Sequence, residues 1–346
     1  MLKRKLGRTG LEVPIVGLGG AGLSEPVEEI APLINRSLER GANFIHVYAH
    51  QEANVGRVLA GRREEFIIAA HVDVYSDPQK KMGTADEIIG RVETCLKDLQ
   101  TDCVELFQFH GVMDEESLSF IRTGGALEGL KKVQAQGKIQ YIGITGHYSP
   151  PLVNALKADD FDTVMVPFNI MRRDFGADPS VGLFPLAERV DTGVIIMKPI
   201  AAGRITKNLR TALKFVLAHD VALAIPGARN VQELDEDIDA AEQFTALSEE
   251  ERKQYADEQF ILGEPYCRQC GYCLPCPGEM NIPAILRMER TCSVFGLKEW
   301  IRAQEVGKLE VHPSRCEGCG VCEPRCPFDL SIRQMIKDAQ QYRQPA

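Results

Sequence analysis

Eight of the eleven cysteines of this 346-residue chain fall into two short runs near its C-terminal end. In each run, two residues separate the first cysteine from the second and the second from the third, and a proline follows the last cysteine. The last two cysteines are separated by two residues in the first run and by three residues in the second. The first run is Cys267, Cys270, Cys273 and Cys276, and the second is Cys316, Cys319, Cys322 and Cys326. Three thiolates at such intervals can surround one face of a metal cluster while a distant fourth completes the site. The two runs therefore indicate two thiolate-bound metal centres.

Both runs resemble the cysteine pattern of bacterial ferredoxins, and the second matches it at every interval. In those proteins the last cysteine of each run binds the cluster of the other run. The resemblance therefore implies two [4Fe-4S] clusters, one bound by Cys267, Cys270, Cys273 and Cys326, the other by Cys316, Cys319, Cys322 and Cys276. The alternatives are structural zinc, which also uses paired Cys-x2-Cys ligands, and disulfides, which need an oxidising compartment. Neither explains two triplets that both precede a Cys-Pro pair, so we favour iron–sulfur clusters.

The segment between the two runs carries apolar residues at helical spacing. These residues are Ile282, Ile285, Leu286 and Met288, followed by Phe295, Leu297, Trp300 and Ile301. We therefore predict a mainly helical, ferredoxin-like domain over residues 261–346, rather than the compact βαβ form.

Residues 1–260 alternate short apolar runs with amphipathic segments, which is typical of repeated βα units. The candidate strands are Val13–Gly17, Phe44–Val47, Phe66–Ala70, Cys103–Phe109, Tyr141–Ile144, Thr163–Val166, Val194–Met197 and Ala222–Ile225. The candidate helices between them are Val27–Arg40, Asn54–Ala60, Thr84–Leu99, Ala126–Gln136, Pro151–Lys157, Val181–Val190, Leu209–His219 and Val231–Phe244. Eight such units predict an α/β fold, a (β/α)8 TIM barrel, with an open doubly wound sheet as the alternative. The stretch from Lys3 to Val13 predicts a hairpin that covers the N-terminal end of the barrel.

Composition restricts the partners. The hydrophobic share of 44% is sufficient for a large core, and the formal charge of −9 argues against a nucleic-acid surface. No apolar run has the length of a signal peptide or a membrane span, so we expect a cytoplasmic protein. The expected partners are a small-molecule substrate and an electron carrier such as ferredoxin.

Five stretches of the first 245 residues resemble the aldo/keto reductase family. They are Gly7–Pro14, Val16–Gly19, Gly41–Ile45, Leu106–His110 and Ile225–Gly227. Together with the cysteine runs, the whole chain resembles the iron–sulfur branch of that family. The resemblance implies a barrel that binds NADPH at the C-terminal ends of its strands and reduces carbonyls through a tyrosine acid, which an Asp and a Lys tune while a His orients the substrate.

Only part of that catalytic set is present. His110 matches the family's histidine, and Tyr48 falls at the place of the tyrosine when the shorter second loop is aligned with a gap. His46 stands where the family has Asp, and His71 stands where it has Lys. Two imidazoles cannot reproduce an Asp–Lys pair, because they are either both neutral or repel each other when protonated.

The nucleotide-binding positions also differ from the family. Gly227, Ala228 and Glu233 stand where NADPH-using members carry Lys, Ser and Arg, and Met165 replaces the Gln that contacts nicotinamide. Gly227, Arg229 and Asn230 are the remaining candidates for binding NAD(P)(H), with NADH as the alternative to NADPH.

Four histidines end consecutive candidate strands at the face where barrel enzymes carry their chemistry. They are His46, His71, His110 and His147. Neutral imidazoles are ligands for zinc, iron and copper. A mononuclear metal ion at His46, His71 and His110 is therefore one hypothesis; the alternative is that these histidines are hydrogen-bonded substitutions in an altered pocket.

These observations predict an iron–sulfur oxidoreductase of aldo/keto reductase type. Its two [4Fe-4S] clusters would exchange electrons with a substrate in a histidine-rich pocket, with Tyr48 as proton donor, His110 as substrate orienter, and His46 and His71 as ligands or proton relays. One alternative is an NAD(P)H-dependent carbonyl reductase with structural clusters. Another is a non-enzymatic protein that senses redox state or docks a partner.

Overall fold

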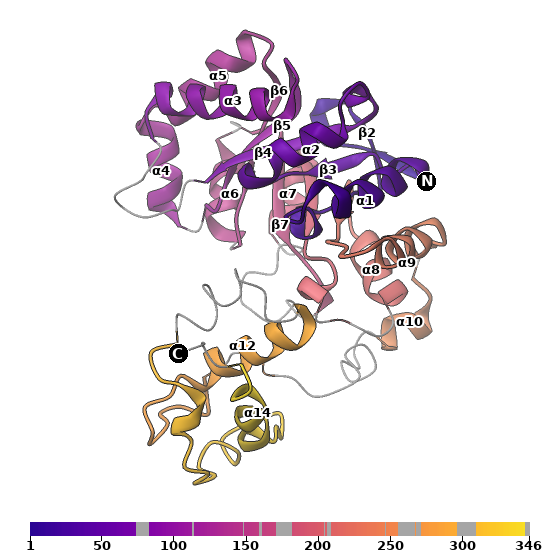
Figure 1. Ribbon diagram of the computed structural model, residues 1–346. Coiled ribbons are helices and arrows are strands. Elements are labelled where there is room, and N and C mark those ends of the chain that lie inside the picture. Colours follow the sequence, from indigo (N-terminus) through magenta and orange to yellow (C-terminus); the bar gives the residue numbers. More distant parts are fainter. Residues whose placement is uncertain are drawn as a thin grey trace. The chain divides into compact units, whose positions relative to one another are not determined.

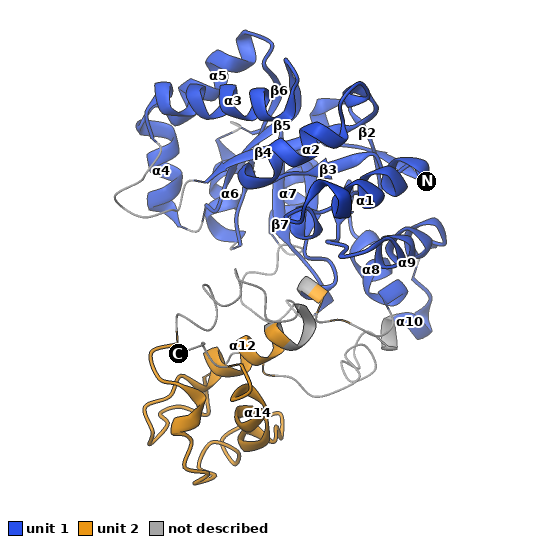
Figure 2. Ribbon diagram, in the orientation of Figure 1, with its two compact units in different colours: residues 1–202, 208–256 blue, residues 203–207, 257–346 orange. Residues whose placement is uncertain are grey.

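The computed structural model describes residues 1–73, 83–112, 114–147, 149–158, 161–170, 182–203, 205, 209–245, 247–254, 267, 271–295 and 309–342. The chain divides into two compact units (Figure 2). The first comprises Met1–Ala202 and Asn208–Ala256, and the second comprises Gly203–Lys207 and Asp257–Ala346. Each unit contains its own hydrophobic core.

Seven parallel strands of the first unit form one continuous sheet, in the order of the sequence (Figure 1). The strands are β3 (Phe44–His46), β4 (Ile67–Asp73), β5 (Val104–His110), β6 (Ile139–Thr145), β7 (Thr163–Pro167), β8 (Gly193–Met197) and β9 (Leu223–Ile225). Val16 bridges to Ala224 of β9, and Leu18 bridges to Ile45 of β3, both in parallel orientation. These two bridges take the place of the predicted first strand and close the sheet into a ring. The predicted (β/α)8 barrel is thus confirmed, and the open sheet is wrong.

Helices connect the strands and form the outer layer of the barrel (Figure 1). They are α1 (Val27–Glu39), α2 (Glu52–Val58), α3 (Ala85–Leu99), α4 (Glu115–Thr123), α5 (Ala126–Ala135), α6 (Ser149–Lys157), α7 (Leu183–Arg189), α8 (Leu209–Leu217) and α9 (Val231–Glu242), followed by α10 (Glu249–Gln254). In α3, Ile88, Val92 and Leu99 recur at helical spacing and are buried. None of the helices within the described ranges has the length and apolar composition needed to cross a bilayer.

The N-terminal hairpin closes one end of the barrel, as predicted. Strand β1 (Lys3–Lys5) pairs antiparallel with β2 (Glu12–Pro14). Leu6 and Val13 belong to the same buried cluster as Phe44, Leu106 and Leu223, which lie near the starts of the barrel strands. The hairpin therefore removes apolar surface at the N-terminal end of the barrel from water and leaves the opposite end for chemistry.

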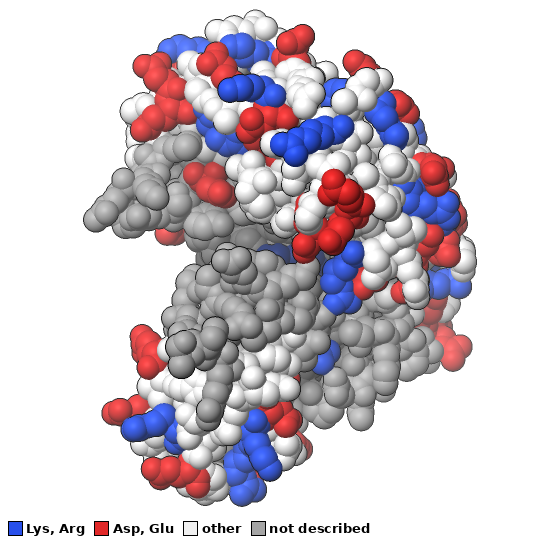
Figure 3. Space-filling view, viewed as in Figure 1, with Lys and Arg blue, Asp and Glu red and all other residues white. Residues whose placement is uncertain are grey.

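Ion pairs join the first and last helices of the ring. Arg40, directly after α1, lies 2.6 Å from Asp235 and from Asp239 of α9, and 3.0 Å from Glu242. Arg36 also contacts Asp235, at 2.9 Å. On the face drawn in Figure 3, acidic and basic side chains of the described residues lie next to one another and do not form separate patches.

The second unit is built around two helices, α12 (Ile282–Phe295) and α14 (Ile332–Ala339), which pack against each other. Its core contains apolar side chains from both helices and from the segments beside the cysteines. They include Met280, Ile282, Ile285, Leu286, Met288, Leu330, Ile332 and Ile336. The predicted helical spacing thus corresponds to α12, while Leu297, Trp300 and Ile301 lie outside the described residues.

Candidate functional site

Three histidines lie inside the barrel near the C-terminal ends of neighbouring strands. His46 ends β3, His110 ends β5, and His71 lies two residues before the end of β4. Strand residues two positions apart face the same way, and Phe44 and Ala69, two positions before His46 and His71, belong to the barrel core. All three histidines are buried, with at most 5% of the residue exposed. The strand pairing thus brings three predicted site residues into one cluster.

Asp73 joins this group and was not predicted. It is the last residue of β4, and its Oδ1 lies 2.7 Å from Nδ1 of His110 and 3.7 Å from Nε2 of His71. The predicted strand ended at Ala70, so the residues after His71 were not assigned to it. The two-residue alternation of a strand, extended from His71, would have identified Asp73.

Tyr48 lies directly beside the histidines. Its ring centroid is 5.0 Å from those of His46 and His71 and 6.0 Å from that of His110. The ring also packs against Gly20, where a Cβ atom would come within 2.7 Å of the tyrosine ring. The four predicted catalytic residues therefore form one cluster around a half-buried phenol.

Burial determines the charge of two of these histidines. Burial, together with the charge that a protonated His110 would carry, lowers the pKa of His46 to about 3. Burial also lowers the pKa of His71 well below its usual value, with His46 and His110 acting in the same direction. Both rings are therefore neutral at neutral pH. Among the described residues, Nε2 of His46 and both ring nitrogens of His71 have no hydrogen-bond partner.

A buried ion pair supports the backbone of β4 at His71. Arg91 of α3 donates to Glu52 at 3.0 Å and to the carbonyl oxygen of His71 at 3.0 Å. The guanidinium reaches the backbone of His71, and Glu52 balances its charge. Arg91 therefore fixes the position of the strand but does not replace the lysine that the family carries at His71.

A second cation contacts a histidine that lies beside this cluster. Nζ of Lys198, which follows β8, is 2.5 Å from Nε2 of His147, which follows β6. The His147 ring centroid lies 6.3 Å from that of His110. A hydrogen bond between two nitrogens requires a lone pair on one of them, so this pair cannot carry two positive charges.

Two of the predicted nucleotide-binding residues, Arg229 and Asn230, lie just before α9 and contact its first turn. Arg229 forms an ion pair with Glu233 at 2.6 Å. Asn230 caps the helix, because its side-chain oxygen accepts from the backbone N–H of Glu233 at 2.9 Å. The Glu233 carboxylate also accepts from the backbone N–H of Arg229 at 2.8 Å. A carboxylate therefore already occupies the helix N-terminus, where a phosphate would bind. Gly227 packs so closely on Ala21 that a Cβ atom would lie 2.5 Å from the alanine methyl group.

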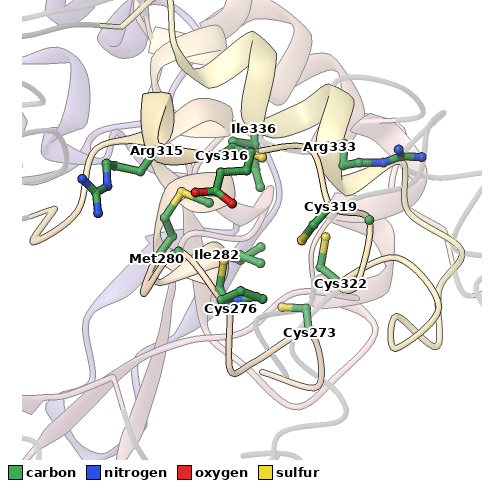
Figure 4. Close-up of a pocket in the computed structure, with 14 residues that line it drawn as sticks. Cys273, Cys276, Met280, Ile282, Arg315, Cys316, Cys319, Cys322, Arg333 and Ile336 are labelled. Carbon is green, nitrogen blue, oxygen red and sulfur yellow. The ribbon is translucent and has the colours of Figure 1, made fainter.

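In the second unit, the cysteines line two pockets. The first pocket is bordered by Cys276 of the first run and by three cysteines of the second run, together with Cys273 (Figure 4). The second pocket is bordered by Cys267, Cys273 and Cys326. Cys270 lies outside the described residues. The last cysteine of each run thus borders a pocket of the other run.

The walls of these pockets fit thiolate-bound iron–sulfur groups. The described cysteines form no disulfides. Apolar side chains such as Met280 and Ile336 complete the first pocket, and Leu286 and Phe328 complete the second. Burial raises the pKa of the Cys322 thiol, and Glu323, Cys316 and Cys319 raise it further. Clustered thiolates repel one another, so a set of this kind is stabilised by a cationic iron core.

Residues 15–212 match the Aldo/keto reductase family, and residues 309–330 match the 4Fe-4S binding domain. The oxidoreductase YqkF of Bacillus subtilis is 26% identical over 306 residues, covering 73% of this chain and 95% of that protein. L-galactose dehydrogenase of Arabidopsis thaliana is 25% identical over 240 residues, covering 62% of this chain and 74% of that protein.

Solved structures show the same barrel. The holo form of an aldo-keto reductase from Bacillus halodurans has a TM-score of 0.64 at 24% identity, covering 75% of this chain and 99% of that chain. An aldo-keto reductase from Klebsiella pneumoniae in complex with NADPH has a TM-score of 0.60 at 19% identity, covering 78% of this chain and 98% of that chain. At sequence identities this low, these structures show that the fold is shared.

Proposed function

Because this chain belongs to the aldo/keto reductase family and carries a 4Fe-4S binding domain, we propose that it transfers electrons between two [4Fe-4S] clusters and a small molecule in the barrel pocket. The observation that carries this proposal is the pairing of cysteines from both runs at each pocket of the second unit. A shared arrangement of that kind is typical of two-cluster ferredoxins.

The residues that would hold the clusters follow from the pocket walls and the ferredoxin pattern. They are Cys316, Cys319, Cys322 and Cys276 for one, and Cys267, Cys270, Cys273 and Cys326 for the other. When bound, such clusters supply single electrons. An external carrier such as ferredoxin is the donor or acceptor that we propose, and the cytoplasm, where thiols stay reduced, is the proposed compartment.

In the barrel, Tyr48 is the proposed proton donor to the oxygen of a carbonyl-type substrate. His110 is the proposed orienting residue, and Asp73 positions it by accepting the Nδ1–H of its ring. This hydrogen bond fixes the orientation of the His110 ring, whose Nε2 would then contact the substrate oxygen. His46 and His71 flank the Tyr48 ring and would relay protons to it.

An NAD(P)H-dependent carbonyl reductase with structural clusters is the second candidate. The solved neighbour with bound NADPH favours it. In this chain the nucleotide would rely on Gly227, Arg229 and Asn230, but Arg229 is paired with Glu233, whose carboxylate would repel a phosphate. We therefore place this candidate second.

Two anaerobic measurements distinguish the candidates. In the first, NADPH and NADH are titrated calorimetrically into the holoprotein, and we expect no binding. In the second, reduced clusters are mixed with carbonyl compounds, their reoxidation is followed by absorbance, and the reduced product is quantified. Tight NADPH binding would favour the second candidate, while cluster reoxidation without any organic product would favour a redox sensor.

A further inference from the structure

We propose that His71, Asp73 and His110 bind one divalent transition-metal ion, separate from the cysteine-bound iron. The three side chains each offer one ligand atom, and these atoms all lie within 4.8 Å of one another. Two imidazoles and one carboxylate, with positions left open, form the donor set of mononuclear Fe(II) and Zn(II) sites. This inference deepens the proposed function, because it adds a substrate-polarising ion to the same pocket.

The hydrogen-bonding state of His71 points to a missing partner. The residue is 1% exposed, and neither ring nitrogen has a hydrogen-bond partner among the described residues. A neutral imidazole has one N–H group and one lone pair, and burying either of them without a partner is unfavourable. Coordination of an ion through Nε2 would satisfy one of these nitrogens. Arg91 holds the His71 backbone at 3.0 Å and keeps the ring at this position.

The spacing of the ligands suits a single ion. Nε2 of His71 is 3.7 Å from Oδ1 of Asp73, and Nδ1 of His110 is 2.7 Å from the same oxygen. Ligands about 2.0–2.2 Å from a tetrahedral ion are roughly 3.3–3.6 Å apart. One pair is slightly too wide and the other slightly too close, so small side-chain rotations are sufficient. In the process, the hydrogen bond between His110 and Asp73 would be exchanged for two bonds to the ion.

The strands hold these ligands in register. Asp73 of β4 is the pairing partner of His110 of β5, and His71 lies on the same face of β4, two residues earlier. Ligands on paired strands are held more precisely than ligands on loops, which a metal site requires. The site is therefore built into the barrel wall.

Asp73, rather than His46, is the third ligand that we infer. The His46 and His71 rings are stacked, with centroids 5.3 Å apart and planes inclined by 20°. Stacked rings present their faces to each other instead of converging through their nitrogens. Asp73 also supplies the negative charge that offsets the charge of the ion. The ion would then lie beside Tyr48 and supply the positive charge that the family obtains from lysine.

The experiment uses full-length, cluster-loaded protein incubated with one equivalent of Zn²⁺ under anaerobic conditions and then desalted. Elemental analysis measures retained zinc, and zinc-edge X-ray absorption identifies its ligands without interference from iron. We expect about one zinc per chain with only nitrogen and oxygen ligands at roughly 2.0–2.2 Å. Zinc that is not retained, or that has sulfur ligands, would overturn the proposal.

Variants test the ligand set. His71→Ala and Asp73→Asn should each lower zinc affinity at least tenfold, while His46→Ala and the matched exposed control His50→Ala should retain the ion. Unchanged cluster iron and circular dichroism show that each variant is folded. Loss of zinc in His46→Ala with retention in Asp73→Asn would refute the ligand set. Zinc binding is measured without turnover, so it can succeed while the proposed electron transfer fails, and the reverse also holds.

Discussion

Asp73 and Lys198 bring to the histidine cluster a carboxylate and an ammonium group, the two charges that His46 and His71 do not supply. The carboxylate of Asp73, at the end of β4, contacts His110. The ammonium group of Lys198, directly after β8, contacts His147. The phenol of Tyr48 therefore lies beside the two neutral imidazoles of His46 and His71, and the charged groups contact the neighbouring histidines, His110 and His147. At the residue scale, the chemistry depends on protons that can move between these groups.

Replacing Tyr48 by Phe should abolish proton donation while leaving the clusters intact. We expect the rate at which a carbonyl substrate reoxidises the reduced clusters to fall by about a hundredfold or more. The matched control is Tyr141→Phe, because that hydroxyl donates to the Thr9 carbonyl at 2.6 Å, at the hairpin end of the barrel. Equal rates in native protein and Tyr48→Phe would contradict the assigned role.

Asp237 predicts a pH-dependent stability. It is buried on α9, and burial, with help from Glu233 and Glu236, raises its pKa from 3.8 to about 8. Above pH 3.8 the unfolded chain releases this proton while the folded chain retains it, so the native protein loses stability as pH rises towards about 8. Asp237→Asn should therefore be more stable than native protein by about 1–3 kcal/mol near pH 8 and nearly equal near pH 4. Urea unfolding at both pH values measures this, and an equal difference at both would contradict the assignment.

At the scale of elements, the turn of the hairpin packs closely against the start of β8. Gly7 has φ of +50°, and a Cβ atom there would lie 2.2 Å from the backbone nitrogen of Gly193. Gly10 has φ of +71° but meets nothing within 4 Å. Both glycines therefore have a positive φ, but only Gly7 packs against the barrel.

This difference gives a paired prediction. Gly10→Ala should destabilise the barrel by about 1 kcal/mol through its backbone conformation alone. Gly7→Ala should cost about 3 kcal/mol or more, because the hairpin must also move away from β8. Thermal unfolding of both variants compares them directly. Equal losses would show that the hairpin does not depend on this contact.

The elements that could be predicted from sequence were those with a strong apolar period. The strands from Phe44 onward were found because their runs are short and apolar, whereas Val16 and Leu18 form only two bridges. Helix α4 was not predicted; it is short and buries only Leu118 and Ile121. The histidines and Tyr48 could be placed from the strand ends, but Asp73 could not, because that strand extends beyond its apolar run.

At the scale of the whole molecule, each proposed cluster takes three cysteines from one run and the last cysteine of the other run. Double variants test this crossed arrangement. If it is correct, Cys276→Ala with Cys316→Ala removes two ligands from one cluster and leaves about four irons as one intact [4Fe-4S] cluster. The matched pair, Cys267→Ala with Cys276→Ala, damages both clusters. The electron paramagnetic resonance spectrum of the reduced protein shows which clusters remain. The opposite pattern, with an intact cluster only in the second pair, would mean that each run binds its own cluster.

The most direct test of the account is the iron and acid-labile sulfide content of the anaerobically isolated native chain, with the cluster type read by Mössbauer spectroscopy. The account predicts about eight irons and eight sulfides per chain, all in [4Fe-4S] form. About four of each, or zinc in place of iron at the cysteines, would contradict it.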